Sequence, residues 1–258
     1  MSQSLAGKLV VVTGASRGIG AAIALELASR GASVLVHYSS SGSAALDVAE
    51  QIRSSTGGQS QAWTVQADLG TLECADIVMR KVDEIGMPIH ALVLSGAVSY
   101  HKSIEDLDVG SIQKEFTEQM NINVRSTILL VNAAIKRLAN PSRIVILSSI
   151  AARSGTPLQT VYGASKASLE HCAKVWSKEL GHKYGTTVNC VNPGPTQTDM
   201  WKGTPQAIGD GHKIEETAAA HRLAVPDDVA QIVAFLCEEG SRWVSGSTVN
   251  ANGGHLPN

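Results

Sequence analysis

The sequence lacks the features that mark disulfide-rich, zinc-binding and nucleic-acid-binding proteins. Its four cysteines are widely separated and form no CxxC pair, which argues against a zinc site and against a disulfide framework. No block of like charge occurs and the formal net charge is −2, so nothing points to nucleic acid or to an anionic membrane surface. We therefore expect buried free thiols in a reducing compartment, no metal site and no nucleic-acid partner.

The sequence also lacks a targeting segment and a membrane span. Residues 1–8 contain no cationic stretch leading into an apolar one, and no apolar run reaches membrane-spanning length. A chain of 258 residues, 43% of them hydrophobic, can build a large core, and α/β folds of this size routinely form one domain. We expect a single domain over residues 1–258, a cytoplasmic location and no membrane partner.

Short apolar runs alternate with helical periodicity along the chain. The expected strands are Leu9–Val12, Ser33–Tyr38, Gln61–Ala67, Ala91–Leu94, Ile144–Ser148, Val188–Val191 and Thr248–Ala251. The expected helices follow Gly20, cover Ser43–Ser55, Thr71–Ile85 and Ser111–Leu138, run from Tyr162 toward Lys183, and begin at Pro226. This alternation predicts a doubly wound α/β fold, with a parallel sheet of about seven strands and helices on both faces.

A glycine-rich motif, Thr13-Gly-Ala-Ser-Arg-Gly-Ile-Gly20, follows the first expected strand and opens a helix. Glycines let the backbone approach a pyrophosphate closely, and the helix amino terminus offers free N–H groups and partial positive charge. Glycine clusters also occur in ordinary turns. The strand before this motif and the helix after it favour a dinucleotide site.

The end of the second strand indicates which dinucleotide is bound. NAD-preferring sites usually carry an acidic residue there, which binds the ribose hydroxyls and repels a ribose phosphate. This chain has Tyr38-Ser39-Ser40-Ser41 and no acid until Asp47, while Arg17 can supply a cation for a 2′-phosphate. The pattern favours NADP(H). The alternative is that Arg17 points to solvent and the serines only fill a loop.

A second motif extends from Ser149 to Lys166. Tyr162 and Lys166 stand four residues apart, so on a helix they share one face. A nearby ammonium favours the phenolate and is expected to lower the tyrosine pKa from its ordinary value of about 10. Ser149 follows an apolar run and is placed at the carboxyl end of a strand, where ligands of α/β sheets collect. Taken alone, the Tyr/Lys pair also fits a solvated helix face.

Together the two motifs resemble the short-chain dehydrogenase/reductase family, with its TGxxxGxG and its serine followed by YxxxK, over nearly the whole chain. The resemblance implies a Rossmann-type fold and reduction of a small-molecule carbonyl substrate by NADPH. It implies that Tyr162 is the general acid, Ser149 a donor to the same oxygen, and Lys166 a group that stabilises the tyrosinate and binds the ribose. It also implies a homodimer or homotetramer, for which the small apolar face of the Tyr162 helix is suited. The alternative is that this face, with Ala164, Ala167, Ser168, Cys172 and Val175, packs within one subunit.

The resemblance extends to shorter segments, with departures. Asn123-x-x-Ser126 resembles Asn-x-x-Gly, whose asparagine holds a water linked to the active-site lysine; Asn121 and a surface role for Asn123 are alternatives. Asp68 resembles the cap of an adenine pocket, or else it N-caps the next helix. Ser95-Gly96 stands where the family has Asn-Asn-Ala-Gly, which leaves that loop's geometry open. Thr196 and Thr198, after Pro193-Gly194, resemble donors to the nicotinamide carboxamide or phosphates.

The assigned site is therefore as follows. Catalysis is assigned to Asn123, Ser149, Tyr162 and Lys166. Cofactor contacts are assigned to Gly14, Ser16, Arg17, Gly18, Ile19, Gly20, Tyr38, Ser39, Ser40, Asp68, Leu69, Ser95, Gly96, Asn123, Tyr162, Lys166, Pro193, Gly194, Thr196 and Thr198.

The substrate is less defined by the sequence. The run Ser95–Tyr100 and the triple serine resemble fungal polyhydroxynaphthalene reductases and related polyketide ketoreductases. The segments expected to line the pocket are Val98–Ser103, Ile150–Gln159 and Asp199–Ala220, the last of them within a mobile lid at 199–222. Their Tyr100, Leu158, Met200 and Trp201 suggest an apolar or aromatic ring. The alternatives are a 3-oxoacyl thioester reductase, an NAD(P)+-dependent alcohol dehydrogenase, an epimerase or dehydratase, and a non-catalytic NADPH-binding sensor.

Overall fold

The computed structural model describes residues 3–204 and 214–256, and their strands form one parallel sheet. The strand order is β3-β2-β1-β4-β5-β6-β7. The strands are β1 (Leu9–Val12), β2 (Ser33–Tyr38), β3 (Ala62–Gln66), β4 (Ile89–Leu94), β5 (Leu138–Leu147), β6 (Thr186–Pro193) and β7 (Thr248–Ala251). The predicted seven-stranded, doubly wound sheet is confirmed.

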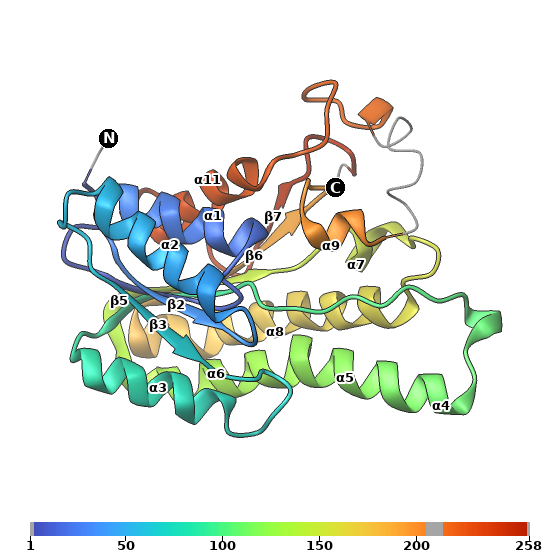
Figure 1. The fold of residues 1–258 in the computed structure, drawn as a ribbon, viewed down its shortest axis with the longest axis horizontal. Coiled ribbons are helices and arrows are strands. Elements are labelled where there is room, and N and C mark those ends of the chain that lie inside the picture. The colour runs from blue at the N-terminus through green and yellow to red at the C-terminus, as the bar shows by residue number, and fades with distance from the viewer. Residues whose placement is uncertain (1–2, 205–213, 257–258) are drawn as a thin grey trace.

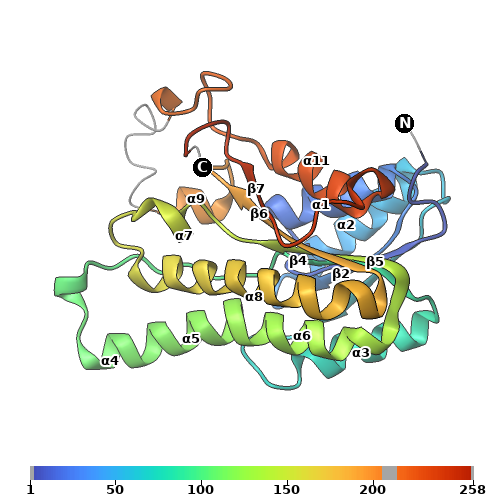
Figure 2. The same ribbon diagram turned by 180° about the vertical axis from the view of Figure 1, so that it is seen from behind.

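Helices cover both faces of this sheet, as Figure 1 shows, and Figure 2 shows the same layers from behind. One face carries α1 (Gly18–Ser29), α2 (Gly42–Ser55) and α11 (Pro226–Cys237). The other carries α3 (Cys74–Ile85), α8 (Thr160–Tyr184) and a helical run at 109–137 that contains α4 (Val109–Ser111), α5 (Thr117–Gln119) and α6 (Ser126–Ala134).

The alternation of side chains along β1 divides the core between the two faces. Val10 and Val12 enter the apolar cluster that includes α1, whereas Leu9 and Val11 enter the cluster on the α8 face. Successive side chains of a strand point to opposite faces, so a fully buried strand must be apolar at every position. This explains why β1 reads as a continuous Leu-Val-Val-Val run.

Two predicted boundaries differ in the structure. The helical run ends at Arg137 and β5 begins at once at Leu138, so the expected break at Asn140-Pro141 lies inside a strand. The ladder between β4 and β5 changes register there, and a proline without an N–H is tolerated in a strand at such an irregularity. The helix expected from Thr71 begins instead at Cys74, because the Thr71 N–H and hydroxyl both bond to the carbonyl of Asp68 in a turn.

A buried histidine holds the glycine-rich turn between β1 and α1. The Nδ1 atom of His37, on β2, accepts a hydrogen bond from the Gly14 N–H at 3.1 Å, and its Nε2 lies 3.0 Å from the carbonyl of Ala67 after β3. His37 is 1% exposed, and burial lowers its pKa to about 4. The neutral ring therefore accepts at one nitrogen and donates at the other. The turn is thereby fixed relative to both neighbouring strands.

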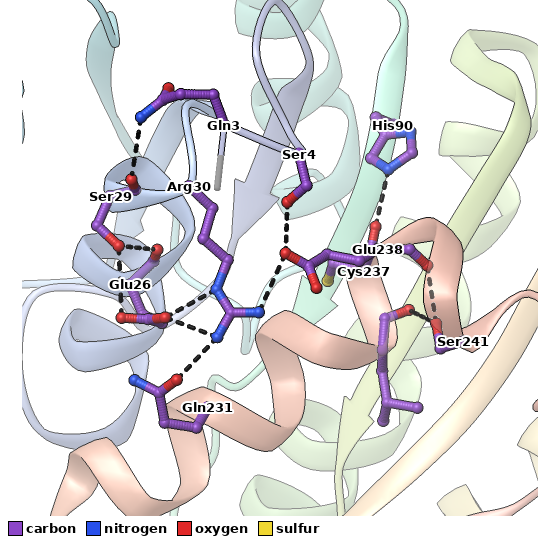
Figure 3. Close-up of polar contacts among 11 residues, drawn as sticks. Gln3, Ser4, Glu26, Ser29, Arg30, His90, Gln231, Cys237, Glu238 and Ser241 are labelled. Atoms are coloured by element: carbon purple, nitrogen blue, oxygen red, sulfur yellow. Dashed lines mark hydrogen bonds and ion pairs between the residues drawn. The ribbon is translucent and has the colours of Figure 1, made fainter. Parts of the chain in front are cut away.

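An ion-pair network joins the amino-terminal segment to α1 and α11 (Figure 3). The guanidinium of Arg30, after α1, lies 2.7 Å from Glu26 and 3.1 Å from Glu238, and it donates to Gln231 at 2.8 Å. The Ser4 hydroxyl donates to the same Glu238 carboxylate. Only 17% of the Arg30 side chain is exposed, so this cation bridges two carboxylates with little screening by water.

Three further expectations concern the surface and the thiols. All four cysteines are free; Cys172 is half-buried and the other three are buried. Within residues 3–204 and 214–256, no helix combines the length and apolar character needed to span a membrane. The α8 face with Ala164, Ala167 and Val175 is exposed, and its covering by a second subunit stays a prediction.

The Arg30 network predicts a measurable stability effect. Replacing Arg30 by Met leaves two carboxylates facing each other, so we expect the free energy of unfolding to fall by about 1–3 kcal/mol in urea titrations. Lys81→Met is the control, because Lys81 pairs only with Glu84, whose side chain is 64% exposed. The control should lose less than about 0.5 kcal/mol. Equal losses in the two variants would contradict this account.

The His37 contacts predict a pH effect. In the unfolded state His37 takes up its proton near pH 6.5, whereas in the folded state its pKa is about 4. The contribution of His37 therefore makes the free energy of unfolding fall as the pH falls through this window. Between about pH 7 and about pH 5 we expect wild type to lose about 1–2 kcal/mol more than His37→Asn. His90 shifts in the same direction and remains in both proteins, so the variant isolates His37. An exposed control, His171→Asn, should keep the wild-type slope; identical slopes in all three proteins would refute the contribution.

Candidate active site

A cavity of about 1030 Å³ lies at the carboxyl edge of the sheet. Its wall includes the residues that follow β1, β2, β4, β5 and β6. The connections from β1 lead through β2 to β3 on one side, and β4 lies on the other side of β1, so the strand order reverses at this point. A crevice at such a reversal is where doubly wound sheets bind ligands. Two short helices, α7 (Ala151–Ser154) and α9 (Asp199–Lys202), lie at this edge (Figure 1).

The glycine-rich turn packs directly against the loop after β4. A Cβ on Gly14, whose φ is +63°, would lie 2.8 Å from the Cα of Gly96, and one on Gly20 would lie 2.3 Å from the Gly14 carbonyl oxygen. Thr13 Oγ1 accepts hydrogen bonds from the N–H groups of Ser95 and Gly96 at 3.0 and 3.1 Å. The Thr13 hydroxyl therefore fixes the loop whose geometry the sequence left open.

The end of β2 forms the wall beside this turn. Ser39 and Ser40 line the cavity, whereas Tyr38 does not and packs its ring against Gly42. Arg17 is exposed at the cavity wall, and no hydrogen bond or ion pair involves its side chain within the described part of the chain. This wall therefore carries an unpaired cation and hydroxyl groups.

Asp68 also lines this wall, and its alternative role is wrong. Its carboxylate accepts a hydrogen bond from the N–H of Gly70 at 2.8 Å. The residue before α3 is Glu73, so Asp68 closes a local turn and does not cap that helix. Its carboxylate lies at the cavity wall, with Leu69 buried beside it.

Ser149, Tyr162 and Lys166 converge in the middle of the cavity. Ser149 follows β5, and its hydroxyl accepts from the Ala151 N–H at 3.2 Å and is hydrogen-bonded to the Tyr162 side chain. One helical turn separates Tyr162 from Lys166 on α8, and the Lys166 Nζ lies 5.7 Å from the centroid of the tyrosine ring. The same Nζ donates to the carbonyl of Leu147 at 2.7 Å. The three side chains therefore face one space.

The pKa of Tyr162 differs from the expectation. Burial raises it above its ordinary value, and the hydrogen bond with Ser149 opposes this only in part. Burial also lowers the pKa of Lys166 to about 8. The expected lowering of the tyrosine pKa by Lys166 is thus wrong for this structure, because desolvation of the phenolate is the largest effect on that pKa and the Lys166 ammonium is bonded to the Leu147 carbonyl. The phenol stays protonated at neutral pH.

Asn123 lies under the cavity, in a π-helical turn at 120–125. Its side chain donates to the carbonyl of Val98 and accepts from the N–H of Val98, both at 2.9 Å, and donates to Ser165 at 3.1 Å. It is 1% exposed, which excludes the surface alternative, and Asn121 lies instead at a separate surface hollow. The amide is occupied in holding the Val98 loop, and its role in holding a water stays a prediction.

The segment after β6 closes the other side. Pro193 and Gly194 line the cavity, but the Thr196 hydroxyl donates to Gly194 at 2.9 Å and the Thr198 hydroxyl donates to Thr196 at 3.3 Å. Both hydroxyl protons are therefore used within the segment, and Thr198 also caps α9. Part of the expected lid, residues 205–213, lies outside the described residues, and the lid's mobility stays a prediction.

Most residues assigned from the sequence share this cavity wall, and Tyr38 and Asn123 do not. The assigned residues that line it are Gly14, Ser16, Arg17, Gly18, Ile19, Gly20, Ser39, Ser40, Asp68, Leu69, Ser95, Gly96, Ser149, Tyr162, Lys166, Pro193, Gly194, Thr196 and Thr198. Sequence reasoning did not assign Thr13 and His37, whose partners lie far away along the chain, and it placed Ser99, His101 and Gln159 in pocket-lining segments without a role of their own. A polar residue inside an apolar strand was the available signal for His37.

Known sequences resemble the chain over almost its full length. A family model described as enoyl-(acyl carrier protein) reductase matches residues 14–255. Short-chain dehydrogenase/reductase FrzI of Cladobotryum sp is 45% identical over 258 residues, covering 97% of this chain and 96% of that protein. Hydroxynaphthalene reductase-like protein Arp2 of Metarhizium acridum is 34% identical over 267 residues, covering 98% and 97%.

Solved structures agree with these matches. A dehydrogenase/reductase from Sinorhizobium meliloti 1021 has a TM-score of 0.89 at 32% identity, covering 99% of this chain and 98% of that one. Angucycline C-6 ketoreductase LanV with bound NADP has a TM-score of 0.88 at 33% identity, with the same coverage. Because the family model spans most of the chain and a relative is 45% identical over its length, the chain belongs to the short-chain dehydrogenase/reductase family.

Proposed function

We propose that the protein reduces a cyclic, aromatic or polyketide-like ketone to a secondary alcohol with NADPH. The observation that carries this proposal is the convergence of Ser149, Tyr162 and Lys166 on the cavity that the glycine-rich turn also lines. Relatives named as a hydroxynaphthalene reductase-like protein and as a ketoreductase with bound NADP support the reaction class.

The cavity wall fits a phosphorylated dinucleotide. The first residues of α1, Gly18 to Gly20, line the cavity, and the first N–H groups of a helix have no partner within the helix, so they suit a pyrophosphate. Arg17, the residue before α1, is unpaired within the described residues, and Ser39 and Ser40 after β2 stand in place of the usual acid, which suits a ribose 2′-phosphate. NADPH bound there would supply the hydride.

The side chains of the site then have distinct tasks. Protonated Tyr162 donates its proton to the substrate oxygen, and the Ser149 hydroxyl stabilises the charge that develops on that oxygen. Lys166, 5.7 Å from the ring centroid, stabilises the phenolate that remains. Donors arranged in advance around a developing oxyanion contribute about 3–4 kcal/mol each to transition-state stabilisation.

The protonation state of Tyr162 is the one that a ketone reduction uses. Burial raises the tyrosine pKa and keeps the phenol protonated, so it can act as a general acid. NADPH oxidation assays compare ring ketones with 3-oxoacyl thioesters as substrates, because no contact among the described residues of the cavity distinguishes these two classes.

Removing the proton donor tests the mechanism. For Tyr162→Phe we expect kcat to fall by about 10²–10⁴-fold in NADPH oxidation assays with a ring ketone, because general acid catalysis is lost. The dissociation constant of NADPH should change by less than about threefold, since the phenol is not placed at the phosphate wall. Tyr184→Phe is a matched control, because Tyr184 lies on the same helix with a lysine over its ring and outside the cavity wall. Retained turnover in Tyr162→Phe would refute the mechanism.

Removing the unpaired cation tests the cofactor. For Arg17→Ala we expect kcat/KM for NADPH to fall by about 10–100-fold, the loss typical of a hydrogen bond to a charged group, with little change for NADH. Arg53→Ala, on the exposed side of α2 and outside the cavity wall, should leave both values unchanged. If Arg17→Ala lowers kcat/KM for NADPH and for NADH equally, Arg17 does not bind the 2′-phosphate.

A further inference from the structure

A polar set of three side chains lies in the cavity wall beside Tyr162 and has no task in the mechanism. It consists of Ser99, His101 and Gln159, and is called the His101 set below. The His101 Nε2 lies 3.1 Å from the Ser99 hydroxyl, and its Nδ1 lies 3.4 Å from the Gln159 amide nitrogen. The set therefore links the loop after β4 to the residue that precedes α8.

The backbone around the His101 set is fixed by buried groups. Asn123 bonds to both backbone groups of Val98, and Gln119, 1% exposed, accepts from the N–H of Tyr100 at 3.1 Å. The Lys102 N–H donates to the carbonyl of Leu158 at 2.9 Å, and Leu158 has a φ of +68°, a conformation uncommon for leucine. These contacts hold both sides of the set in place before any ligand binds.

The hydrogen bonds within the His101 set show which group donates and which group accepts. An amide NH2 can only donate, so Gln159 donates to Nδ1 of His101. Burial lowers the pKa of His101, which favours the neutral ring, and its single proton then lies on Nε2 and points to the Ser99 oxygen. No other hydrogen bond involves the Ser99 hydroxyl in residues 3–204 and 214–256. Ser99 is left with one O–H donor at the cavity wall.

The position of the set relative to Tyr162 follows from α8. Gln159 is the residue before α8 and Tyr162 lies in the first turn of that helix, and both side chains line the cavity. A substrate oxygen at the phenol and a second oxygen at Ser99 would therefore be bound at two points of one cavity wall. Ile150, Met200 and Trp201 supply apolar wall in the same cavity, where a single donor discriminates strongly.

We propose that the His101 set is a second recognition point, at which Ser99 donates a hydrogen bond to a further oxygen on the substrate ring. The substrate class is then an oxygenated ring ketone, either a hydroxyketone or a diketone, and not a plain cyclic ketone. This inference rests on the proposed ketone reduction. His101 acts as a positioning residue, since it occupies the Ser99 oxygen lone pair and directs the hydroxyl proton toward the cavity.

The test compares 1-tetralone with its 5-, 6- and 7-hydroxy derivatives as substrates of the NADPH-loaded enzyme. We expect kcat/KM for the best hydroxytetralone to exceed that for 1-tetralone by about tenfold, as one additional hydrogen bond allows. Ser99→Ala and His101→Phe should reduce this preference to within about twofold. His171→Phe, an exposed position of α8 outside the cavity wall, should retain the full preference.

A binding measurement separates this inference from the proposed function. If wild type reduces no tetralone, the proposed ketone reduction fails, while calorimetric binding of the same compounds to the NADPH complex still reports the preference. A tenfold preference in affinity that Ser99→Ala removes supports the second recognition point with or without turnover. Equal affinity of wild type for all four compounds, or a preference that persists in Ser99→Ala, overturns it.

Discussion

The close approach of two backbone segments, at Gly14 and Gly96, is the constraint on which the site depends. These glycines follow β1 and β4, the neighbouring strands between which the strand order reverses. Because a Cβ on Gly14 would lie 2.8 Å from the Gly96 Cα, a side chain on Gly14 would force the two loops apart. Thr13 then accepts hydrogen bonds from the N–H groups of Ser95 and Gly96, and His37 accepts one from the N–H of Gly14. The backbone that we assign to the cofactor phosphates is thus held in place before a cofactor binds.

The sequence predicted the features that depend on local pattern. All seven strands, the glycine-rich turn and the Ser149–Tyr162–Lys166 group follow from periodicity, glycine spacing or motif, and the structure brings that group to one cavity. The sequence did not predict contacts between segments that lie far apart along the chain. His37 reads as one polar residue in a buried strand, and only the fold shows that its nitrogens reach Gly14 and Ala67. The start of β5 was missed because a proline conceals a strand that continues through a register shift.

The pKa of Tyr162 shows where an argument from spacing fails. Four-residue spacing correctly places Lys166 beside the tyrosine ring, but it carries no information about desolvation or about other acceptors. In the structure both groups are buried, and the Lys166 ammonium bonds to the Leu147 carbonyl. Burial therefore disfavours charge on each of them, which raises one pKa and lowers the other. A protonated donor beside a cation suits the proposed reduction.

Asn123 connects the helix that bears Tyr162 to the loop that bears Ser99. Its π-helical turn places a buried amide against α8 through Ser165 and against the substrate loop through Val98. An asparagine inside a helix competes with backbone hydrogen bonding, so a fully occupied amide at this position indicates that its tertiary contacts outweigh that cost. The helix bearing Tyr162 and the loop bearing Ser99 are consequently held by one side chain. A substitution at Asn123 would therefore displace both Tyr162 and the loop bearing Ser99. A loss of activity in such a variant would report on both displacements and not on proton transfer alone.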